Sequence, residues 1–467
     1  MPLILGTNSI KDTGYNVDNS LRFNSGSTDH LDRTFGQAGN RRTFTVSFWK
    51  KTTTKETYNA IFDSAQDGSN SDDMYFHTGR FNFSGYYGST QYIIRTTAKY
   101  RDPSAWSHFV LALDTTQSTA SNRMKLYVNG SQVTTFDDIT YPSENFQTTY
   151  MNTARLHNIG TLVNGDDFPL DGYLAEFVFI DGQALAPTDF GEFDSDSPTI
   201  WKPKDVSGLT FGTNGFYLDF ENSSDLGNDV SGNNNDFTER NLTSVDLSTD
   251  TCTNNFSTMN PLDVPASNQP TFSEGNLKVV SPSASGDNNF GGASTFAVSS
   301  GKWYIEAKAT VGAGGYSRNR IGITGNESTA RLNNTLGANS YEYFYDSEAG
   351  NSNAGSYGNS YTTGDIIGIA LNLDDNELKF YKNGTVQNSG TAISIDAPLT
   401  TSVGGYKITQ SDSSGVSGAT STFEFNFGSP PYSESGGNSD GNGYGNFAGS
   451  VPSGHFAINS KNLAEYG

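Results

Sequence analysis

The sequence predicts an all-β protein with two antiparallel β-sandwiches in tandem. Two features of its composition favour this fold class. The 467 residues include 31 Phe and 24 Tyr, which favour strands, and 51 Gly, which favour turns. The third observation is a repeat. The stretch MKLYVNG, Met124 to Gly130, occurs again with small changes as LKFYKNG, Leu378 to Gly384.

Each copy of the repeat predicts a β-hairpin. Apolar residues alternate with other residues along the first copy, which is the period of a strand with one buried face. The dipeptides Asn129-Gly130 and Asn383-Gly384 end the two copies. Asn-Gly suits a type I′ turn because both central residues need a positive φ. We therefore interpret the repeat as structural: the chain builds the same hairpin once in each sandwich.

The bulk composition excludes several function classes. A formal net charge of −22 would repel a polyanion, so nucleic acid is not an expected partner. Cys252 is the one cysteine, which rules out an intramolecular disulfide. No apolar run approaches about 18 residues, so we expect no membrane insertion. The opening MPLILGTNSIKD lacks the basic region of a signal peptide, so we expect synthesis in the cytoplasm without export.

Alternating strands dominate residues 1–195, which we predict to be one domain. In chain order they include FTVSFWKK, WSHFVLALD, KLYVNGSQV, HNIGTL and GYLAEFVFIDGQAL. Their order and spacing resemble the laminin-G and pentraxin type of concanavalin A-like jelly roll, over roughly residues 15–195. The resemblance implies a lectin-like, two-sheet β-sandwich.

The rest of the chain divides into three predicted parts. Residues 196–270 are rich in Asn, Asp, Gly and Ser, and we predict a bridging segment there. Residues 271–430 contain GKWYIEAKAT, then GDIIGIALNLDDNELKFYKNG, then TSTFEFNFGS. This order resembles the SPRY domain, which implies a second β-sandwich of the concanavalin A-like kind. Residues 431–467 begin with a Gly/Asn/Ser-rich run and are predicted to be a C-terminal tail.

No catalytic motif is apparent. The five histidines are scattered, and none has the spacing of a zinc site. Glycosidases need two carboxyl groups, about 5–5.5 Å apart in retaining enzymes, and period-2 spacing would place them on one strand face. Glu306 and Glu424 instead stand alone in their strands. We therefore predict a non-enzymatic protein. The alternative is a glycan-degrading enzyme on a concanavalin A-like scaffold.

Two acidic stretches are candidate Ca²⁺ sites. Asp63 and Asp67 lie in DSAQDGSNSDD, and Asp166 and Asp167 lie in NGDDFPLD. Ca²⁺ takes about six to eight oxygen ligands, which loop carboxylates and carbonyls supply. The laminin-G resemblance also implies a Ca²⁺ site at a loop rim. The spacing matches no EF-hand, so solvated loops without metal remain the alternative.

Tyrosines in Gly/Ser-rich stretches are the candidate ligand-binding residues. Tyr86, Tyr87 and Tyr92 lie in FSGYYGSTQY, and Tyr357 and Tyr361 lie in SYGNSY. Aromatic rings stack on the apolar faces of sugars, but tyrosines also occur at subunit interfaces. Glycan contact, subunit contact and packing within loops are therefore all open interpretations.

Three further segments resemble phage proteins. The opening LILGTNSIKDTGYNVDNSLRFN resembles the start of virion-associated proteins in marine phages. The element DLGNDVSGNNNDF resembles one in laminin-G-like phage proteins, and the closing GHFAINSKNL resembles an ending that follows SPRY-like domains in phage proteins. The resemblance implies a structural protein of the virion surface, such as a fibre, a tail-associated subunit or a head decoration. Its partners would be capsid or tail proteins, and it would form a homo-oligomer such as a trimer. The lectin-like domains imply attachment to a host glycan or surface receptor.

Overall fold

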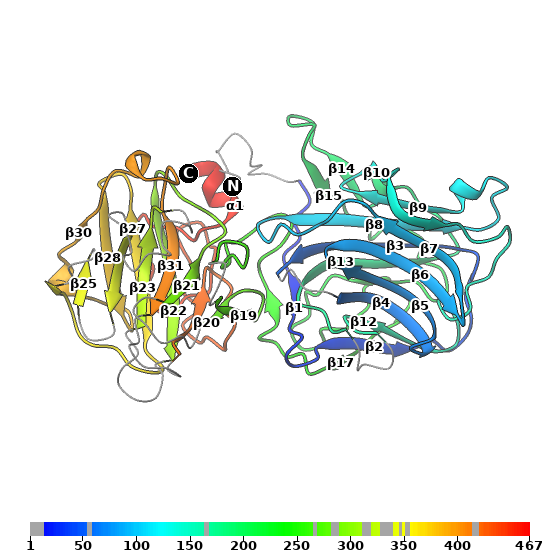
Figure 1. Cartoon of the computed structure of the whole chain (residues 1–467), viewed down its shortest axis with the longest axis horizontal. Coiled ribbons are helices and arrows are strands. Elements are labelled where there is room, and N and C mark those ends of the chain that lie inside the picture. Colours follow the sequence, from blue (N-terminus) through cyan, green and yellow to red (C-terminus); the bar gives the residue numbers. More distant parts are fainter. Residues whose placement is uncertain are drawn as a thin grey trace. The chain divides into compact units, whose positions relative to one another are not determined.

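The computed structural model confirms the all-β fold class. Its antiparallel strands form two compact units, Thr13–Thr253 and Asn254–Gly467, which we call the N-terminal and C-terminal units (Figure 1). Among the described residues, no helix is long and apolar enough to cross a membrane. The structure describes residues 14–53, 58–162, 168–264, 269–281, 289–310, 319–326, 340–344, 348–350, 355–412 and 420–467.

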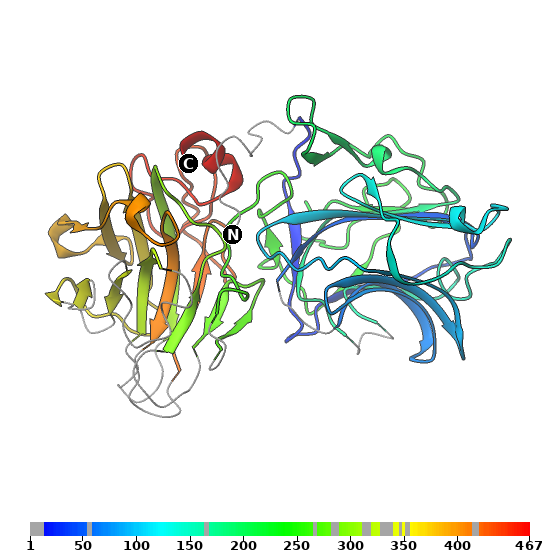
Figure 2. The same ribbon diagram turned by 45° about the horizontal axis from the view of Figure 1, so that its top comes forward.

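The N-terminal unit is a sandwich of two sheets (Figure 2). Sheet A has the order β10 (Ser131–Gln132), β9 (Met124–Val128), β8 (Trp106–Asp114), β3 (Thr43–Thr52), β13 (Gly172–Asp181), β1 (Ser20–Phe23) and β18 (Leu247–Ser248), and β16 (Phe216–Leu218) also pairs with β13. Sheet B has the order β11 (Phe136–Thr140), β7 (Thr90–Thr96), β6 (Arg80–Tyr87), β5 (Asn70–His77), β4 (Tyr58–Asp67), β12 (Leu156–Ile159), β2 (His30–Thr34) and β17 (Thr238–Arg240).

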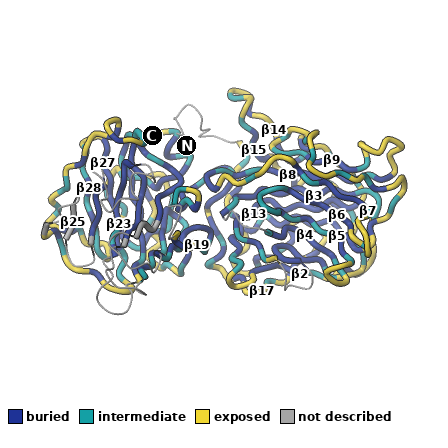
Figure 3. The backbone as a smooth tube through the Cα atoms, in the orientation of Figure 1, coloured by how far each residue is buried: buried dark blue, intermediate teal, exposed yellow. Residues whose placement is uncertain are grey.

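Aromatic side chains fill the space between sheets A and B. Alternation along β3 turns Phe44, Val46 and Phe48 inward, and all three are fully buried. The Phe48 ring stacks on Phe109 at 5.5 Å and on Phe177 at 5.6 Å between centroids. Such pairs contribute beyond the area that they bury. The strands are accordingly the most buried parts of the backbone (Figure 3).

Sheet A is also covered on its other face, by the chain that follows β13. Val110, Val178 and Tyr217 pack there with Phe190, and Trp201 packs in a neighbouring cluster. Strands buried on both faces need apolar residues at successive positions. The covering chain includes the pair β14 (Gly191–Phe193) and β15 (Trp201–Pro203). Short 3₁₀ helices lie at Ala120–Asn122 and Pro187–Asp189.

The predicted bridging segment, residues 196–270, is not a separate part of the structure. Its strands β16, β17 and β18 pair with β13, β2 and β1, so the chain up to Thr253 completes the N-terminal sandwich. The element DLGNDVSGNNNDF is held by one carboxylate: Asp229 accepts from the backbone amides of Tyr217 at 2.9 Å and Asn235 at 2.8 Å. The turn-rich composition of this segment therefore did not reveal that its residues pair with both sheets of the N-terminal sandwich.

The C-terminal unit is a second two-sheet sandwich. Sheet C has the order β19 (Thr271–Ser273), β20 (Lys278–Val280), β32 (Thr422–Asn426), β22 (Lys302–Thr310), β27 (Ile366–Asn372), β28 (Glu377–Lys382) and β29 (Thr385–Val386), and β30 (Ile393–Ser394) pairs with β28. Sheet D has the order β21 (Asn289–Ala293), β31 (Lys407–Asp412), β23 (Asn319–Thr324), β24 (Ser340–Phe344), β25 (Glu348–Gly350) and β26 (Gly355–Ser356). The 3₁₀ helices of this unit are Asn388–Gly390 and Pro398–Thr400, and its α-helix is α1 (Ser460–Tyr466).

The predicted tail, residues 431–467, is an ordered part of the C-terminal unit. Glu306 on β22 accepts hydrogen bonds from the backbone amides of Ala448 and Gly449, both at 2.8 Å. Ile458 and Leu463 belong to the apolar core of this unit. Residues of the tail therefore pack on sheet C and donate hydrogen bonds to its buried carboxylate. The low-complexity composition of this segment did not predict that it is ordered.

The two Asn-Gly turns have the same backbone conformation. The φ angles are 47° and 76° at Asn129-Gly130 and 48° and 75° at Asn383-Gly384, the positive pair that a type I′ turn requires. Their surroundings differ. A β-carbon on Gly130 would lie 2.4 Å from the Trp201 ring, whereas the nearest atom to one on Gly384 is 3.7 Å away.

This difference predicts unequal effects of Gly→Ala changes. Gly384→Ala should cost the C-terminal unit about 1–2 kcal/mol, the penalty of a side chain at positive φ. Gly130→Ala should cost the N-terminal unit clearly more, because the Trp201 ring must also move. Thermal unfolding of each variant measures both effects. Equal losses, or no loss at Gly130, would contradict this account of the hairpins.

A β-bulge in β13 places a buried carboxyl group under the covering chain. The register with β3 shifts between Ala175 and Val178, and Glu176 has a φ of 50°. The Tyr217 hydroxyl donates to the Glu176 carboxyl at 2.7 Å. Burial raises the pKa of Glu176 from 4.5 to about 8, and nearby Asp219 adds to the shift. Glu176 is therefore protonated at neutral pH in the folded unit.

Glu176→Gln, which imitates the protonated carboxyl group, should change how stability depends on pH. A raised folded-state pKa gives stability that is present below pH 4.5 and is lost as pH rises toward 8. The variant escapes this loss, so its advantage over wild type should grow by about 1.4 kcal/mol per pH unit across that window. Denaturant unfolding at several pH values measures it. Glu144→Gln, at an exposed position, is the control and should show no such trend.

Candidate functional site

The outer face of sheet B carries a row of polar side chains that crosses five strands. Backbone pairing places Asp32 on β2 beside Asn158 on β12, then Asp63 on β4, Asp73 on β5 and Ser84 on β6. We call these residues the acidic row. Because side chains alternate along each strand, the neighbouring Met74 and other apolar residues point the opposite way, into the core.

Next to the acidic row lies an aromatic cluster of Tyr58, Tyr75, His77 and Phe168. The Tyr58 ring stacks on His77 at 4.2 Å and contacts Phe168 at 4.3 Å and Tyr75 at 5.8 Å between centroids. Phe168 is 43% exposed. Its carbonyl accepts from the Ala60 amide at 3.0 Å, which ties it to β4. The cluster therefore presents ring surface at the outer face of sheet B.

Hydrogen-bonding groups flank the aromatic cluster on β6 and β7. Arg95 donates through Nε to the Asn82 side-chain oxygen at 2.8 Å, and its Nη1 lies 3.9 Å from carboxylate oxygens of Asp137 and Asp138. Burial, with the positive charges of Arg95 and Arg80, lowers the pKa of His77. The histidine ring is therefore neutral at physiological pH, and the cluster is uncharged.

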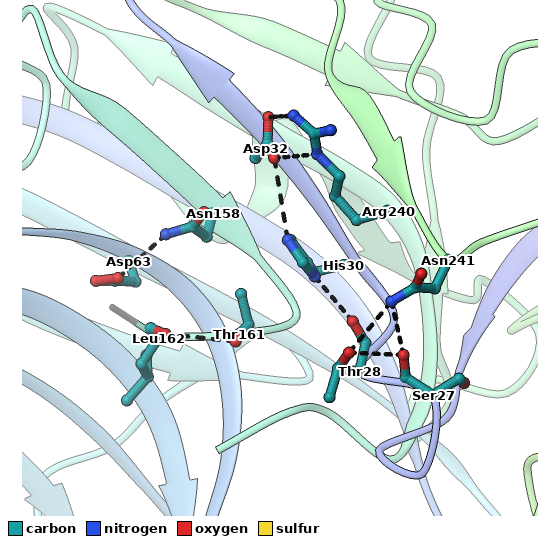
Figure 4. Close-up of polar contacts among 10 residues, drawn as sticks. All are labelled: Ser27, Thr28, His30, Asp32, Asp63, Asn158, Thr161, Leu162, Arg240 and Asn241. Carbon is teal, nitrogen blue, oxygen red and sulfur yellow. Dashed lines mark hydrogen bonds and ion pairs between the residues drawn. The ribbon is translucent and has the colours of Figure 1, made fainter. Parts of the chain in front are cut away.

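The carboxylates of Asp32 and Asp63 in the acidic row have different polar neighbours. The Asp32 carboxylate accepts from Arg240 Nε at 2.5 Å, and His30 Nε2 lies 3.9 Å from it (Figure 4). Further along the row, Asn158 Nδ2 lies 3.4 Å from an Asp63 carboxylate oxygen, and Figure 4 shows the two side chains turned toward each other. Asp63 and Asn158 are buried.

Asp73 adjoins Asp63 in the next strand. Ser71 donates to one Asp73 carboxylate oxygen at 2.5 Å, and the Asp63 and Asp73 carboxyl groups lie within hydrogen-bonding reach of each other. Burial raises the pKa of Asp73 to about 6.

The three predicted tyrosines of β6 and β7 occupy different environments. Tyr92 is fully buried and donates to Asp72 at 2.6 Å, and the Tyr87 hydroxyl donates to the same carboxylate. Asp72 also accepts from the backbone amide of Tyr150 at 2.7 Å, so its carboxylate holds the loop that contains Tyr150 against the sheet. Tyr86 is 40% exposed. Its position permits ligand contact, whereas burial prevents the Tyr92 ring from offering a face to a ligand.

The predicted tyrosines of the C-terminal unit are core residues. Tyr357 packs edge-on against Phe380 at 5.9 Å, and the Tyr361 hydroxyl donates to the Asn319 carbonyl at 2.7 Å. Both tyrosines are buried. The interpretation as packing, which the sequence left open, is the one that fits these two positions.

The four predicted Ca²⁺ ligands do not form one site in the described structure. Asp63 belongs to the acidic row. Asp67 is exposed, and its carboxylate accepts from the Ser69 amide and the Asn70 side chain, at 2.8 Å and 2.9 Å. Asp166 and Asp167 lie outside the described residues. Across the described part of the chain, no three His, Cys, Asp or Glu side chains gather closely enough to hold a metal by themselves.

The sequence indicated Asp63 as a candidate metal ligand, but neither the acidic row as a whole nor the aromatic cluster as a site. The acidic row joins single residues of separate strands, so only the cross-strand register brings them together. A signal was present in SDDMYFH, where alternation places Asp73, Tyr75 and His77 on one face of β5.

Two family models match the chain. One is described as the concanavalin A-like lectin/glucanases superfamily, of the laminin-G type, and matches residues 24–189. The other is the SPRY domain and matches residues 302–404. Both predicted resemblances are thereby confirmed, and the chain carries lectin-like folds. Among curated proteins, no match is found.

Several solved structures are similar to the chain. A heptameric SAP-like pentraxin from Limulus polyphemus is 20% identical, with 36% of this chain and 78% of that chain covered and a TM-score of 0.28. The SPRY domain of human HERC1 is 15% identical, with coverage of 36% and 96% and a TM-score of 0.28. Domains LG4-5 of the mouse laminin alpha1 chain are 10% identical, with coverage of 96% and 89% and a TM-score of 0.30.

Proposed function

We propose that this protein is a non-enzymatic component of a phage virion surface, and that its N-terminal unit binds a glycan of the host surface. The observation that carries the glycan proposal is the aromatic cluster, Tyr58, Tyr75, His77 and Phe168, beside the polar side chains of Asn82 and Arg95.

The chemistry of this face suits a sugar. Pyranose rings have apolar C–H faces that stack on aromatic rings, and their hydroxyl groups need donors and acceptors at fixed positions. Arg95 and Asn82 hold each other in place, so little side-chain freedom is lost when a ligand binds. Because the His77 ring is neutral, a sugar that stacks on the cluster would not have to displace water from a charged imidazolium group.

The proposed place on the virion rests on the sequence. The opening resembles the start of virion-associated proteins, and the DLGNDVSGNNNDF element and the closing segment resemble parts of phage proteins. The chain has a single cysteine, so it needs no intramolecular disulfide for folding. In this proposal capsid or tail proteins anchor the chain, and a homo-oligomer presents several copies of the face. Multivalent display would convert weak single contacts into firm attachment.

Substitutions on the outer face of sheet B test the glycan proposal. Tyr75→Ala and Phe168→Ala should each weaken binding to host cells or to arrayed glycans about 10-fold or more, the range typical of central aromatic contacts. Phe193→Ala removes an exposed aromatic side chain of β14, in the chain that covers the other sheet, and serves as the control, with binding retained. Unchanged binding in the first two variants, or an equal loss in the control, would refute the assigned face.

Two measurements test the rest of the proposal. Mass spectrometry of purified phage particles should detect the chain in fixed ratio to known structural proteins, and its absence there would overturn the virion role. Incubation with host polysaccharide should release no reducing ends. Release that persists in a highly purified sample would favour the alternative, a glycan-degrading enzyme.

A further inference from the structure

A buried lysine and a buried aspartate meet on the covered face of sheet A. Lys51 is fully buried on β3, and Asp250, in the segment after β18, is 2% exposed. The Lys51 Nζ atom lies 2.5 Å from the Asp250 Oδ2 atom. The amine of one side chain and the carboxyl group of the other are therefore held next to each other, away from bulk water.

Aromatic side chains lie beside this pair. Strand pairing places Lys51 between Trp106 on β8 and Tyr173 on β13, and both belong to an apolar cluster with Trp49. An ion pair is costly to bury in such surroundings, because water no longer solvates either charge. Burial lowers the pKa of Lys51, although the Asp250 charge opposes that shift. The environment therefore favours transfer of a proton from the ammonium group to the carboxylate, which leaves a neutral amine and a carboxylic acid.

The two carboxyl oxygens of Asp250 have different neighbours. The Trp106 indole Nε1 donates to Oδ1 at 3.1 Å, while the Lys51 amine donates to Oδ2. A fixed N–H donor at Oδ1 would stabilise negative charge that develops on that oxygen. A neutral lysine amine is a nucleophile, and holding it against its target removes much of the entropic cost of bringing the two groups together.

We propose that Lys51 and Asp250 condense after folding to form an intramolecular isopeptide bond between the Lys51 nitrogen and the Asp250 carboxyl carbon. The ammonium group gives one proton to Oδ2, and the amine then attacks the carbon while negative charge develops on Oδ1. A second proton passes from nitrogen to Oδ2, the bond from carbon to Oδ2 breaks, and water leaves with that electron pair. The nitrogen keeps its third proton in the amide, so the step needs no oxidant, cofactor or other reactant.

The bond joins two points that are 199 residues apart in sequence. It attaches the end of the covering chain, close to the boundary of the N-terminal unit at Thr253, to an interior strand of sheet A. A covalent link across so long a loop restricts the unfolded chain, as a disulfide does. The inference does not rest on glycan recognition, because the pair lies on sheet A and the aromatic cluster lies on sheet B.

Mass spectrometry of the purified full chain tests the proposal. The intact mass should be lower than the mass calculated from the sequence by one molecule of water. Trypsin should fail to cleave after Lys51, because it does not recognise an acylated lysine, and Lys51 and Asp250 should appear together in one branched peptide. The denatured chain should also migrate faster than a linear chain in a denaturing gel, because the link closes a large loop.

Two variants separate the bond from the ion pair. Lys51→Arg keeps a positive charge beside Asp250 but cannot condense, since a guanidinium group stays protonated. It should regain the mass of one water, migrate as a linear chain and lower the unfolding temperature of the N-terminal unit. Lys407→Arg changes a comparable buried pair, in which Lys407 Nζ lies 2.5 Å from Asp263, and should keep the branched peptide at Lys51.

Three results would overturn the proposal: a wild-type chain of full mass, a mass loss carried by a linear peptide, or a branch that persists unchanged in Lys51→Arg. The second would identify a succinimide, which an aspartate also forms by loss of water. The wild-type mass and peptide map decide the question even if Lys51→Arg does not fold. None of these results bears on glycan binding, so the two proposals fail separately.

Discussion

The N-terminal unit depends on the burial of sheet A on both faces. One face packs against sheet B through the Phe48 stack, and the other holds Val110, Val178 and Tyr217 under the chain that follows β13. Burying a large apolar side chain stabilises a fold by roughly 1.5–3 kcal/mol, so exposing this second face would be costly. The covering chain is therefore part of the sandwich. Sheet B has no such covering chain in the described structure, and polar and aromatic side chains lie on its outer face.

Charged groups inside this covered layer show how closely the two parts are joined. Lys51 on β3 donates to Asp250 at 2.5 Å, and Trp106 donates to the same carboxylate at 3.1 Å. Burial lowers the pKa of Lys51, and Asp250 opposes that shift. Breaking such a buried pair typically costs about 3–5 kcal/mol, because it leaves one charge without compensation. Asp250 thus fixes the end of the covering chain to sheet A at a point 199 residues from Lys51 in sequence.

The sequence predicted local structure well and cross-strand structure poorly. The turns at Asn129-Gly130 and Asn383-Gly384 could be inferred because few dipeptides favour two successive positive φ angles. The environments of Tyr86 and Tyr87 could not, because a bulge after Gly85 shifts the register with β7. The pattern of inward-facing and outward-facing side chains before such a bulge does not predict which way the side chains after it point.

The remaining polar groups separate by whether their hydrogen bonds are satisfied. Asp72 accepts from two tyrosine hydroxyls and two backbone amides, and Asp229 accepts from backbone amides of the loop that it holds. Satisfied carboxylates of this kind rigidify a fold and have little capacity left for a ligand. One carboxylate oxygen of Asp73 accepts a hydrogen bond from Ser71, and the other is buried without a donor. The side-chain oxygen of Asn158 is also buried without a donor. This contrast separates Asp72, whose hydrogen bonds hold a loop, from Asp73, whose carboxylate keeps an unused acceptor.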